Sequence, residues 1–265
     1  SIQQAVSAGG VSAWVTAQAA LPLSAPTHEA YVSSVIAAAG SADSNTFYQT
    51  WWRQALTGED QLRQRVAFAL SQILVVSLAD PTIDPRGAAS YYDMLTRDAL
   101  GNFRTLLNEV SLHPMMGRYL TFLGNQKEDA AGTRTPDENY AREVMQLMTI
   151  GLVELNADGT PRLVNGQTVA TYTPADIAGL AKVLTGFSWY HPAPTNTTFL
   201  GGSADPDRSV RPMIAYPNFH STSAKVFLGT TIPASTTVDP MGDLTIALDR
   251  LFNHANTGPF ISLRL

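Results

Sequence analysis

The sequence contains no cysteine. This absence excludes disulfide bonds, thiolate catalysis, zinc–thiolate sites and iron–sulfur clusters together. It leaves the cellular compartment open, because a chain of 265 residues can bury a stable core without cross-links. No apolar run approaches the roughly 20 residues that a membrane-spanning helix needs. We therefore predict that no segment of the chain spans a membrane.

Charged residues are also scarce. They make up 15% of the chain, the net charge is −5, and only three of the 17 basic residues are lysine. Proteins that bind nucleic acid normally present a basic face, and docking to anionic lipid relies on clusters of Lys and Arg. The sequence has no such cluster, so we predict no nucleic-acid partner. The 45% hydrophobic content predicts a globular protein.

The familiar catalytic motifs are missing. The sequence has neither a Gly-x-Ser-x-Gly nucleophile elbow nor a glycine loop that would hold a phosphate. The five histidines lie too far apart for a local metal motif: His28, His113, His191, His220 and His254. We therefore predict neither a metal nor a cofactor.

Most of the chain has helical periodicity. Thr173-Pro174-Ala175-Asp176, for example, supplies an N-cap, a proline at the first helical position and an acidic residue in the first turn. Helices are expected around 2–8, 11–19, 28–39, 44–57, 60–78, 87–99, 102–112, 114–123, 137–150, 174–185 and 243–253.

Two segments depart from helix. Asn156-Ala157-Asp158-Gly159 and Asn165-Gly166 have the turn chemistry that hairpins prefer, so a small β-ribbon is expected near 152–172. The stretch 189–240 is rich in Pro, Thr, Gly and Ser and predicts a long irregular excursion with one short strand, Lys225 to Leu228. The predicted fold is mainly α, a multi-helix body with these two insertions.

We predict a single helical domain over 1–265, in which 1–58 could form an N-terminal subregion, and we expect it to be part of a longer protein. The chain starts with Ser1 rather than Met, and an apolar helical segment begins after Gly258-Pro259 and stops within two turns. A helix this short is marginal unless it is packed. A missing C-terminal part of the same protein is therefore expected to pack on 259–265.

The predicted helix at 137–150 is the most informative stretch. At about 100° per residue its apolar and polar residues separate onto opposite sides. The polar side consists of Glu138, Asn139, Arg142, Glu143 and Gln146. In a cleft, Arg142 would hold an anionic or carbonyl group while Glu138 or Glu143 transferred a proton. Alternatively the face is solvated or pairs with neighbouring helices, which spacing alone favours. We predict that Arg142→Ala chiefly destabilises the fold, because removal of one partner would leave buried carboxylates unpaired.

The remaining candidates are histidines, a lysine and aromatic pairs. His113 precedes Pro114 and is expected to cap a helix, whereas His220 and His254 lie in loop-like surroundings. The aromatic pairs Trp51-Trp52 and Tyr91-Tyr92 are predicted to pack in the core and at its rim. A platform on which sugars stack is the alternative. The candidate catalytic residues are Glu138, Arg142, Glu143, His113 and His254, and the candidate binding residues are Asn139, Gln146, His220 and Lys225.

Several segments occur together and in order, and they carry a family resemblance. They are Gln64–Gln72, Ala99–Arg104, His113-Pro114, Glu138–Glu143, Tyr172–Asp176, Leu184–Phe187 and Phe252–Ile261. With these segments, the chain is similar to the bacterial family catalogued as domain of unknown function eighteen hundred. The resemblance implies a bacterial, often exported, largely helical protein, and it implies no established activity.

Two functional hypotheses follow, from different classes. The first is an exported or surface-associated binding or assembly module that displays the ribbon and the excursion 189–240 to a protein or polymer partner. The second is a secreted enzyme, a hydrolase or lyase that acts on a polysaccharide or another polymer by acid–base chemistry, with Glu138, Arg142, Glu143 and His113 or His254 converging. A concave pocket with a histidine within reach of these carboxylates would favour the enzyme.

Overall fold

A computed structural model describes residues 3, 7 and 9–265. By its internal contacts the chain divides into two compact units, Ser1–Leu106 (unit 1) and Leu107–Leu265 (unit 2). About 49% of the chain is helical, and the described residues form 12 α-helices and small two-stranded antiparallel sheets. The prediction of a mainly α fold is confirmed. The helix predicted at 2–8 lies, apart from residues 3 and 7, outside the described residues.

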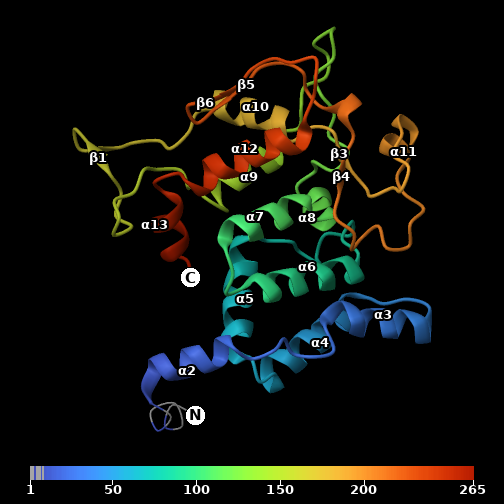
Figure 1. Cartoon of the computed structure of the whole chain (residues 1–265), viewed down its shortest axis with the longest axis vertical. Helices are drawn as coiled ribbons and strands as arrows, with labels where there is room; N and C mark the ends of the chain where they lie inside the picture. Colours follow the sequence, from blue (N-terminus) through green and yellow to red (C-terminus); the bar gives the residue numbers. More distant parts are fainter. Residues whose placement is uncertain (1–2, 4–6, 8) are drawn as a thin grey trace. The chain divides into compact units, whose positions relative to one another are not determined.

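Unit 1 is helical and appears in blue to teal in Figure 1. Its helices are α2 (Gly10–Ala19), α3 (His28–Ala39), α4 (Ser44–Thr57), α5 (Gln61–Ile73) and α6 (Pro85–Asp98), and α7 (Phe103–Leu112) crosses the boundary between the units. Local capping chemistry sets several starts. Asp43 and Thr46 form a capping box at α4, and Asp84 caps α6 just before Pro85.

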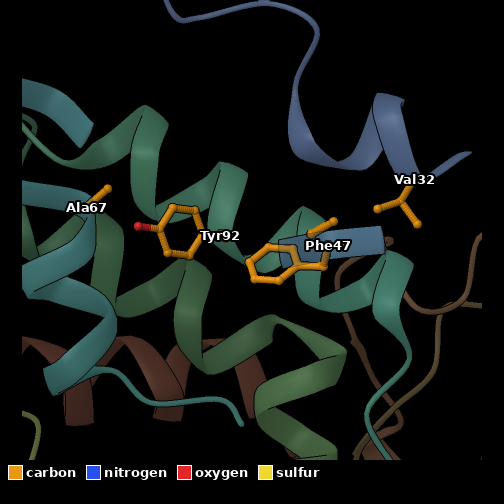
Figure 2. Packing of buried hydrophobic residues seen from close by; sticks show 5 residues of the cluster. Val32, Phe47, Ala67 and Tyr92 are labelled. Carbon is orange, nitrogen blue, oxygen red and sulfur yellow. The ribbon is translucent and has the colours of Figure 1, made fainter. Parts of the chain in front are cut away.

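The core of unit 1 takes one or more side chains from each of α3 to α6. Val32, Phe47, Ala67 and Tyr92, shown as sticks in Figure 2, are buried together with Ala89. Phe47 and Tyr92 meet edge to face with ring centroids 5.9 Å apart, a geometry that aromatic pairs prefer. This cluster holds the four helices together through apolar burial.

Helix α5 ends earlier than the sequence predicts. The pattern predicts a helix at 60–78, but α5 stops at Ile73. Leu74 has left the helical region, with φ −98° and ψ 68°, and the Tyr91 hydroxyl donates to its carbonyl at 2.9 Å. Val75 and Val76 follow, and β-branched residues support helix poorly. The apolar run therefore continues as irregular chain.

Unit 2 combines helices with three two-stranded antiparallel pairs. Its elements are α8 (Pro114–Tyr119), α9 (Asn139–Gln146), β1 (Leu163–Val164), β2 (Gln167–Thr168), α10 (Pro174–Val183), β3 (Phe187–Ser188), α11 (Asn196–Gly201), β4 (Ile214–Ala215), the 3-10 helix η1 (Pro217–Phe219), β5 (Lys225–Phe227), β6 (Thr230–Ile232), α12 (Pro240–Phe252) and α13 (Thr257–Ser262). The strands pair as β1–β2, β3–β4 and β5–β6.

Helix α10 packs against both β5 and α12, and Figure 1 shows these three elements together. Thr173 and Asp176 form the expected capping box, and Asp176 also accepts the Leu228 N–H at 2.6 Å. Gly179 lies against the strand: a Cβ there would come within 1.8 Å of the Val226 carbonyl oxygen. The absence of a side chain at 179 is therefore what lets the β5–β6 hairpin approach α10.

The predicted ribbon is present. Leu163 pairs with Thr168, and the turn residues Asn165 and Gly166 both have positive φ, as a two-residue hairpin turn requires. Buried Asn256 fixes the start of the ribbon to the start of α13: its side chain accepts the Leu155 N–H and donates to the carbonyls of Ile150 and Val153.

The excursion 189–240 contains more regular structure than the sequence predicts. The expected strand at 225–228 is β5, but β4, β6, η1 and α11 were not expected. Thr195 caps α11 through a capping box, and Phe199 stacks on Phe219 with ring centroids 3.8 Å apart. A helix of six residues is too short to show a period, so only this packing reveals it.

Candidate functional site

An open cavity of about 420 Å³ lies on unit 1 between α4, α5, α6 and the segment after α5. We call it the aromatic groove. Tyr48, Trp51, Trp52, Phe68 and Val76 are among its lining side chains, together with buried Tyr92. Its volume falls within the range of about 300–1,000 Å³ that is common for ligand sites.

The aromatic rings of the groove form a connected array. Trp51 meets Trp52 at 4.8 Å in an edge-to-face arrangement, Phe68 at 5.8 Å and Tyr92 at 6.5 Å. Trp52 is 57% exposed and Phe68 is 45% exposed, whereas Tyr92 belongs to the core cluster of Figure 2. The exposed rings are therefore connected, through Trp51 and Tyr92, to the buried core of unit 1.

None of the described residues that line the groove carries a formal charge. Ser71, Gln72 and Ser77 add polar groups, and burial raises the pKa of Tyr92 despite the opposing influence of the Trp51 side chain and the Arg65 charge, so that its phenol stays neutral. The Tyr91 hydroxyl is held by the Leu74 carbonyl. The groove thus offers apolar contact and uncharged hydrogen bonding.

The polar stripe of α9 lies at the surface of unit 2. Arg142 pairs with Glu138 at 3.2 Å, and the two side chains are 45% and 44% exposed. Asn139 donates to the Thr121 hydroxyl at 3.4 Å, and Gln146 accepts from the Tyr172 hydroxyl at 3.2 Å. The premise of the Arg142→Ala prediction, that the carboxylates of this face are buried, was wrong for Glu138: its pair with Arg142 is nearly half exposed, whereas the opposite side, with Tyr140 and Val144, is buried.

Two of the other catalytic candidates, His113 and His254, have a local main-chain contact. His113 is buried at the start of α8, where Nδ1 accepts the Met115 N–H at 3.2 Å. His254 follows α12 and accepts the Asn256 N–H at 3.2 Å, and burial, then the charge of Arg250, lowers its pKa. Glu143 lies in α9, partly buried. Each histidine therefore stabilises a chain turn.

Two of the binding candidates, His220 and Lys225, do come together. Both reach Asp243 Oδ2, His220 Nε2 at 3.0 Å and Lys225 Nζ at 2.9 Å. His220 Nδ1 lies 2.8 Å from the Thr185 carbonyl oxygen, so both ring nitrogens face oxygen acceptors. Lys225 also donates to the Ser221 carbonyl at 2.7 Å. We call His220, Lys225 and Asp243 the Asp243 cluster.

Glu128 is linked to this cluster through Ser221, whose hydroxyl it binds and whose carbonyl binds Lys225. Its Oε1 accepts hydrogen bonds from the hydroxyls of Ser221, at 2.9 Å, and Ser223. Burial acts to raise the pKa of Glu128, but these hydrogen bonds and the charge of Lys182 outweigh it, so the pKa is lowered. The carboxylate therefore stays charged and fixes the chain on both sides of Thr222.

In the described part of the chain, three or more His, Asp or Glu side chains nowhere gather in a way that could hold a metal ion. Equally, no helix of the described chain is long and apolar enough to cross a membrane.

The family described as protein of unknown function (DUF1800) matches residues 1–265. The chain belongs to this family. Among curated proteins and among solved structures, none matches the chain. Because the family's description names no activity, function has to be argued from the geometry of this DUF1800 protein.

One of the segments that carried the resemblance, Leu184–Phe187, contributes to the geometry of unit 2. In Leu184–Phe187, Thr185 holds His220 through its carbonyl and the Ser221 N–H through its hydroxyl. At Gly186, which has φ +76°, a Cβ would lie 2.8 Å from the His220 nitrogen. This segment of the DUF1800 chain therefore supports the Asp243 cluster directly.

Sequence reasoning missed Asp243 and Glu128. Asp243 has the spacing of a first-turn acid in α12 and was interpreted only as a helix start, and Glu128 lies outside every predicted element. Their partners are at least 18 residues away along the chain, so no local pattern could reveal the contacts. For the groove, the adjacent tryptophans Trp51-Trp52 were the available signal.

Proposed function

We propose that this protein is an exported or surface-associated bacterial binding module, and that the aromatic groove of unit 1 holds a protein partner. The observation that carries this proposal is the uncharged array of exposed rings beside an open cavity of about 420 Å³. Soluble proteins rarely leave large apolar side chains together on the surface unless the surface is used for contact. Exposed tryptophan is also enriched at the energetic centres of protein interfaces.

The groove favours an apolar anchor from the partner. A charged ligand would lose water without gaining an ion pair, because the described lining residues carry no formal charge. An aromatic or aliphatic side chain would instead bury surface against Trp52, Phe68 and Val76. Ser71, Gln72 and Ser77 could bond to the main chain that carries this anchor. The occupant is therefore a peptide segment with one or two large apolar residues.

The catalytic alternative gains less from the geometry. Glu138 and Arg142 form an exposed ion pair, while His113 and His254 each accept a main-chain N–H in a different part of unit 2. A proton-transfer site needs its acid and base on one substrate. The hypothesis of a secreted polymer-degrading enzyme stays a prediction that assays on polysaccharides would test.

A selection from a displayed library of random peptides tests the proposal. Peptides enriched on the wild-type protein should share an aromatic or aliphatic anchor, because the groove recognises apolar shape. Their affinities, measured by fluorescence anisotropy, should fall about tenfold or more with Trp52→Ala or Phe68→Ala, since each substitution removes a ring from the binding wall.

Leu56→Ala is the matched control. Leu56 is 71% exposed on the same helix α4 but does not line the groove, so its truncation should leave peptide affinity unchanged. Enriched peptides that bind the Trp52→Ala variant as tightly as the parent would overturn the proposal. The proposal would also be overturned if no peptide were enriched and a neutral oligosaccharide bound the parent but not Trp52→Ala. The groove would then be a platform for sugar stacking.

Fractionation of the producing cells tests export. A protein found in the cytoplasm would contradict the proposed exported or surface-associated location.

A further inference from the structure

A second open cavity, of about 380 Å³, lies in unit 2 beside the Asp243 cluster. The segment from Ile232 to Asp239 forms much of its wall, and Ser221, Lys225 and Asp243 complete it. We call it the Asp243 pocket. It shares no lining residue with the aromatic groove, so the following inference stands independently of the proposed function.

His220 and Lys225 fix one oxygen of Asp243 and leave the other available. Both bind Oδ2, and Asp243 Oδ1 has no hydrogen-bond or ion-pair partner among the described residues. The Asp243 side chain is 14% exposed and lines the cavity. Asp243 therefore lines the pocket with one carboxylate oxygen fixed and the other without a partner among the described residues.

The two basic residues are themselves unable to take a ligand. His220 is fully buried, and its ring nitrogens already lie against Asp243 and the Thr185 carbonyl. Lys225 is 3% exposed, and its ammonium is surrounded by Asp243 and the carbonyls of Ser221 and Ser223. An ammonium group has three donors, and three acceptors occupy them. His220 and Lys225 therefore position Asp243, and Asp243 is the member of the cluster that would contact a ligand.

The charged lining residues of the pocket, Asp239, Asp243 and Lys225, repel an anion and, because Lys225 neutralises Asp243, give a cation little attraction at Asp243. Asp239, at the N-cap of α12, adds a second carboxylate that would repel an anion. A cation at Asp243 Oδ1 would meet the Lys225 ammonium, which already neutralises that carboxylate from 2.9 Å. A neutral ligand with hydroxyl groups avoids both penalties, because each hydroxyl can donate to a fixed carboxylate oxygen.

The rest of the wall fits the same chemistry. Ser235 and Thr237 add hydroxyls, while Pro233 and Val238 provide apolar surface. Pyranose sugars and sugar alcohols combine hydroxyl edges with C–H faces, so they match a wall that is polar on one part and apolar on another. We propose that the Asp243 pocket binds an uncharged sugar unit or sugar alcohol, with Asp243 Oδ1 and the Asp239 carboxylate accepting its hydroxyls.

Titration of the whole chain with neutral and charged sugars tests this site. Glucose, galactose, mannose, N-acetylglucosamine and mannitol are the neutral probes, with glucuronate and glucosamine as charged counterparts, and binding is followed by saturation-transfer NMR and calorimetry. At least one neutral probe should bind saturably, and the charged counterparts of glucose should bind about tenfold more weakly than glucose or not at all, a factor that corresponds to about 1.4 kcal/mol.

Variants locate the binding. Ala234→Phe fills the pocket from its exposed wall and should abolish binding, whereas Thr236→Phe, two residues further on and outside the lining, should not. Asp239→Asn keeps a capping side chain and should weaken binding severalfold. These three residues are exposed, so the variants should fold. Absence of saturable binding by every neutral probe, equal binding by glucuronate and glucosamine, or full binding by Ala234→Phe would overturn the inference.

Discussion

The aromatic groove of unit 1 and the Asp243 cluster of unit 2 differ in how they expose apolar surface and bury charge. Unit 1 leaves Trp52 and Phe68 exposed in a groove whose described lining has no formal charge, whereas unit 2 buries Lys225 and His220 against Asp243. An exposed ring can change its surroundings without disturbing the core beneath it. A buried ion pair requires each partner, because the remaining charge would be left without water. The groove should therefore tolerate substitution, and the Asp243 cluster should not.

Asp243→Ala should have the largest effect. It leaves the Lys225 ammonium in a site that is 3% exposed, and loss of one partner from a buried pair typically costs about 4 kcal/mol. Chemical denaturation followed by circular dichroism measures the loss. Asp239→Ala is the control, since Asp239 caps α12 in the ligand-free protein and its removal should cost about 1 kcal/mol. Equal losses in the two variants would show that the cluster is no more sensitive than a surface cap.

Two buried titratable groups of unit 1, Asp93 and His28, should make the free energy of unfolding depend on pH. Burial raises the pKa of Asp93 to about 6, although the N–H groups of His28 and Glu29 act against it, and burial, aided by the Arg53 charge, lowers the pKa of His28 to about 4. As pH rises from about 4 to about 6, the unfolded chain is ionised at Asp93 while the folded chain still holds that proton, and this lowers stability. Over the same interval the unfolded chain loses its proton at His28, which the folded chain has already lost, and this raises stability. The two contributions, each about 3 kcal/mol, oppose each other.

Variants separate these contributions. Relative to wild type, Asp93→Asn should gain stability as pH rises from about 4 to about 6, because only the His28 contribution remains. His28→Gln should lose stability over the same interval. Urea denaturation at a series of pH values, followed by tryptophan fluorescence, measures both slopes. Slopes of the same sign in the two variants would show that burial does not dominate these pKa values.

Gly179→Ala should destabilise unit 2 by about 2 kcal/mol, since the new methyl group forces β5 away from α10. Gly258→Ala is a matched control: it also lies in a helix, but nothing approaches within 4 Å of its Cβ position. Thermal melts should show a lower midpoint for the first variant and an unchanged or higher one for the second. A Gly179→Ala variant as stable as the parent would mean that the hairpin does not need this approach.

Arg142→Ala should have the smallest effect, within about 0.5 kcal/mol, because its ion pair with Glu138 is exposed and screened by water. Thermal melts of the variant and the wild type measure this effect. A midpoint lowered as much as in Gly179→Ala would show that the polar face of α9 is buried, contrary to the structure.

Local chemistry explains what was predictable. The capping box at Thr173 and the turn at Asn165-Gly166 depend on residues within a few positions of each other, and both occur as expected. The sequence also showed that α9 has one polar side, but it could not show whether that side meets solvent or protein. Periodicity assigns residues to faces, and only the packing of other segments decides which face is covered.

From the sequence alone, a mainly α fold, membership of the DUF1800 family and the absence of thiol chemistry could be determined, since these depend on composition, period and local motifs. Only the tertiary structure brought Asp243 to His220 and Lys225 and left Trp52 beside a cavity. The physical reason is that pairing and exposure depend on which distant segments exclude water from a side chain, and no spacing along the chain encodes that directly.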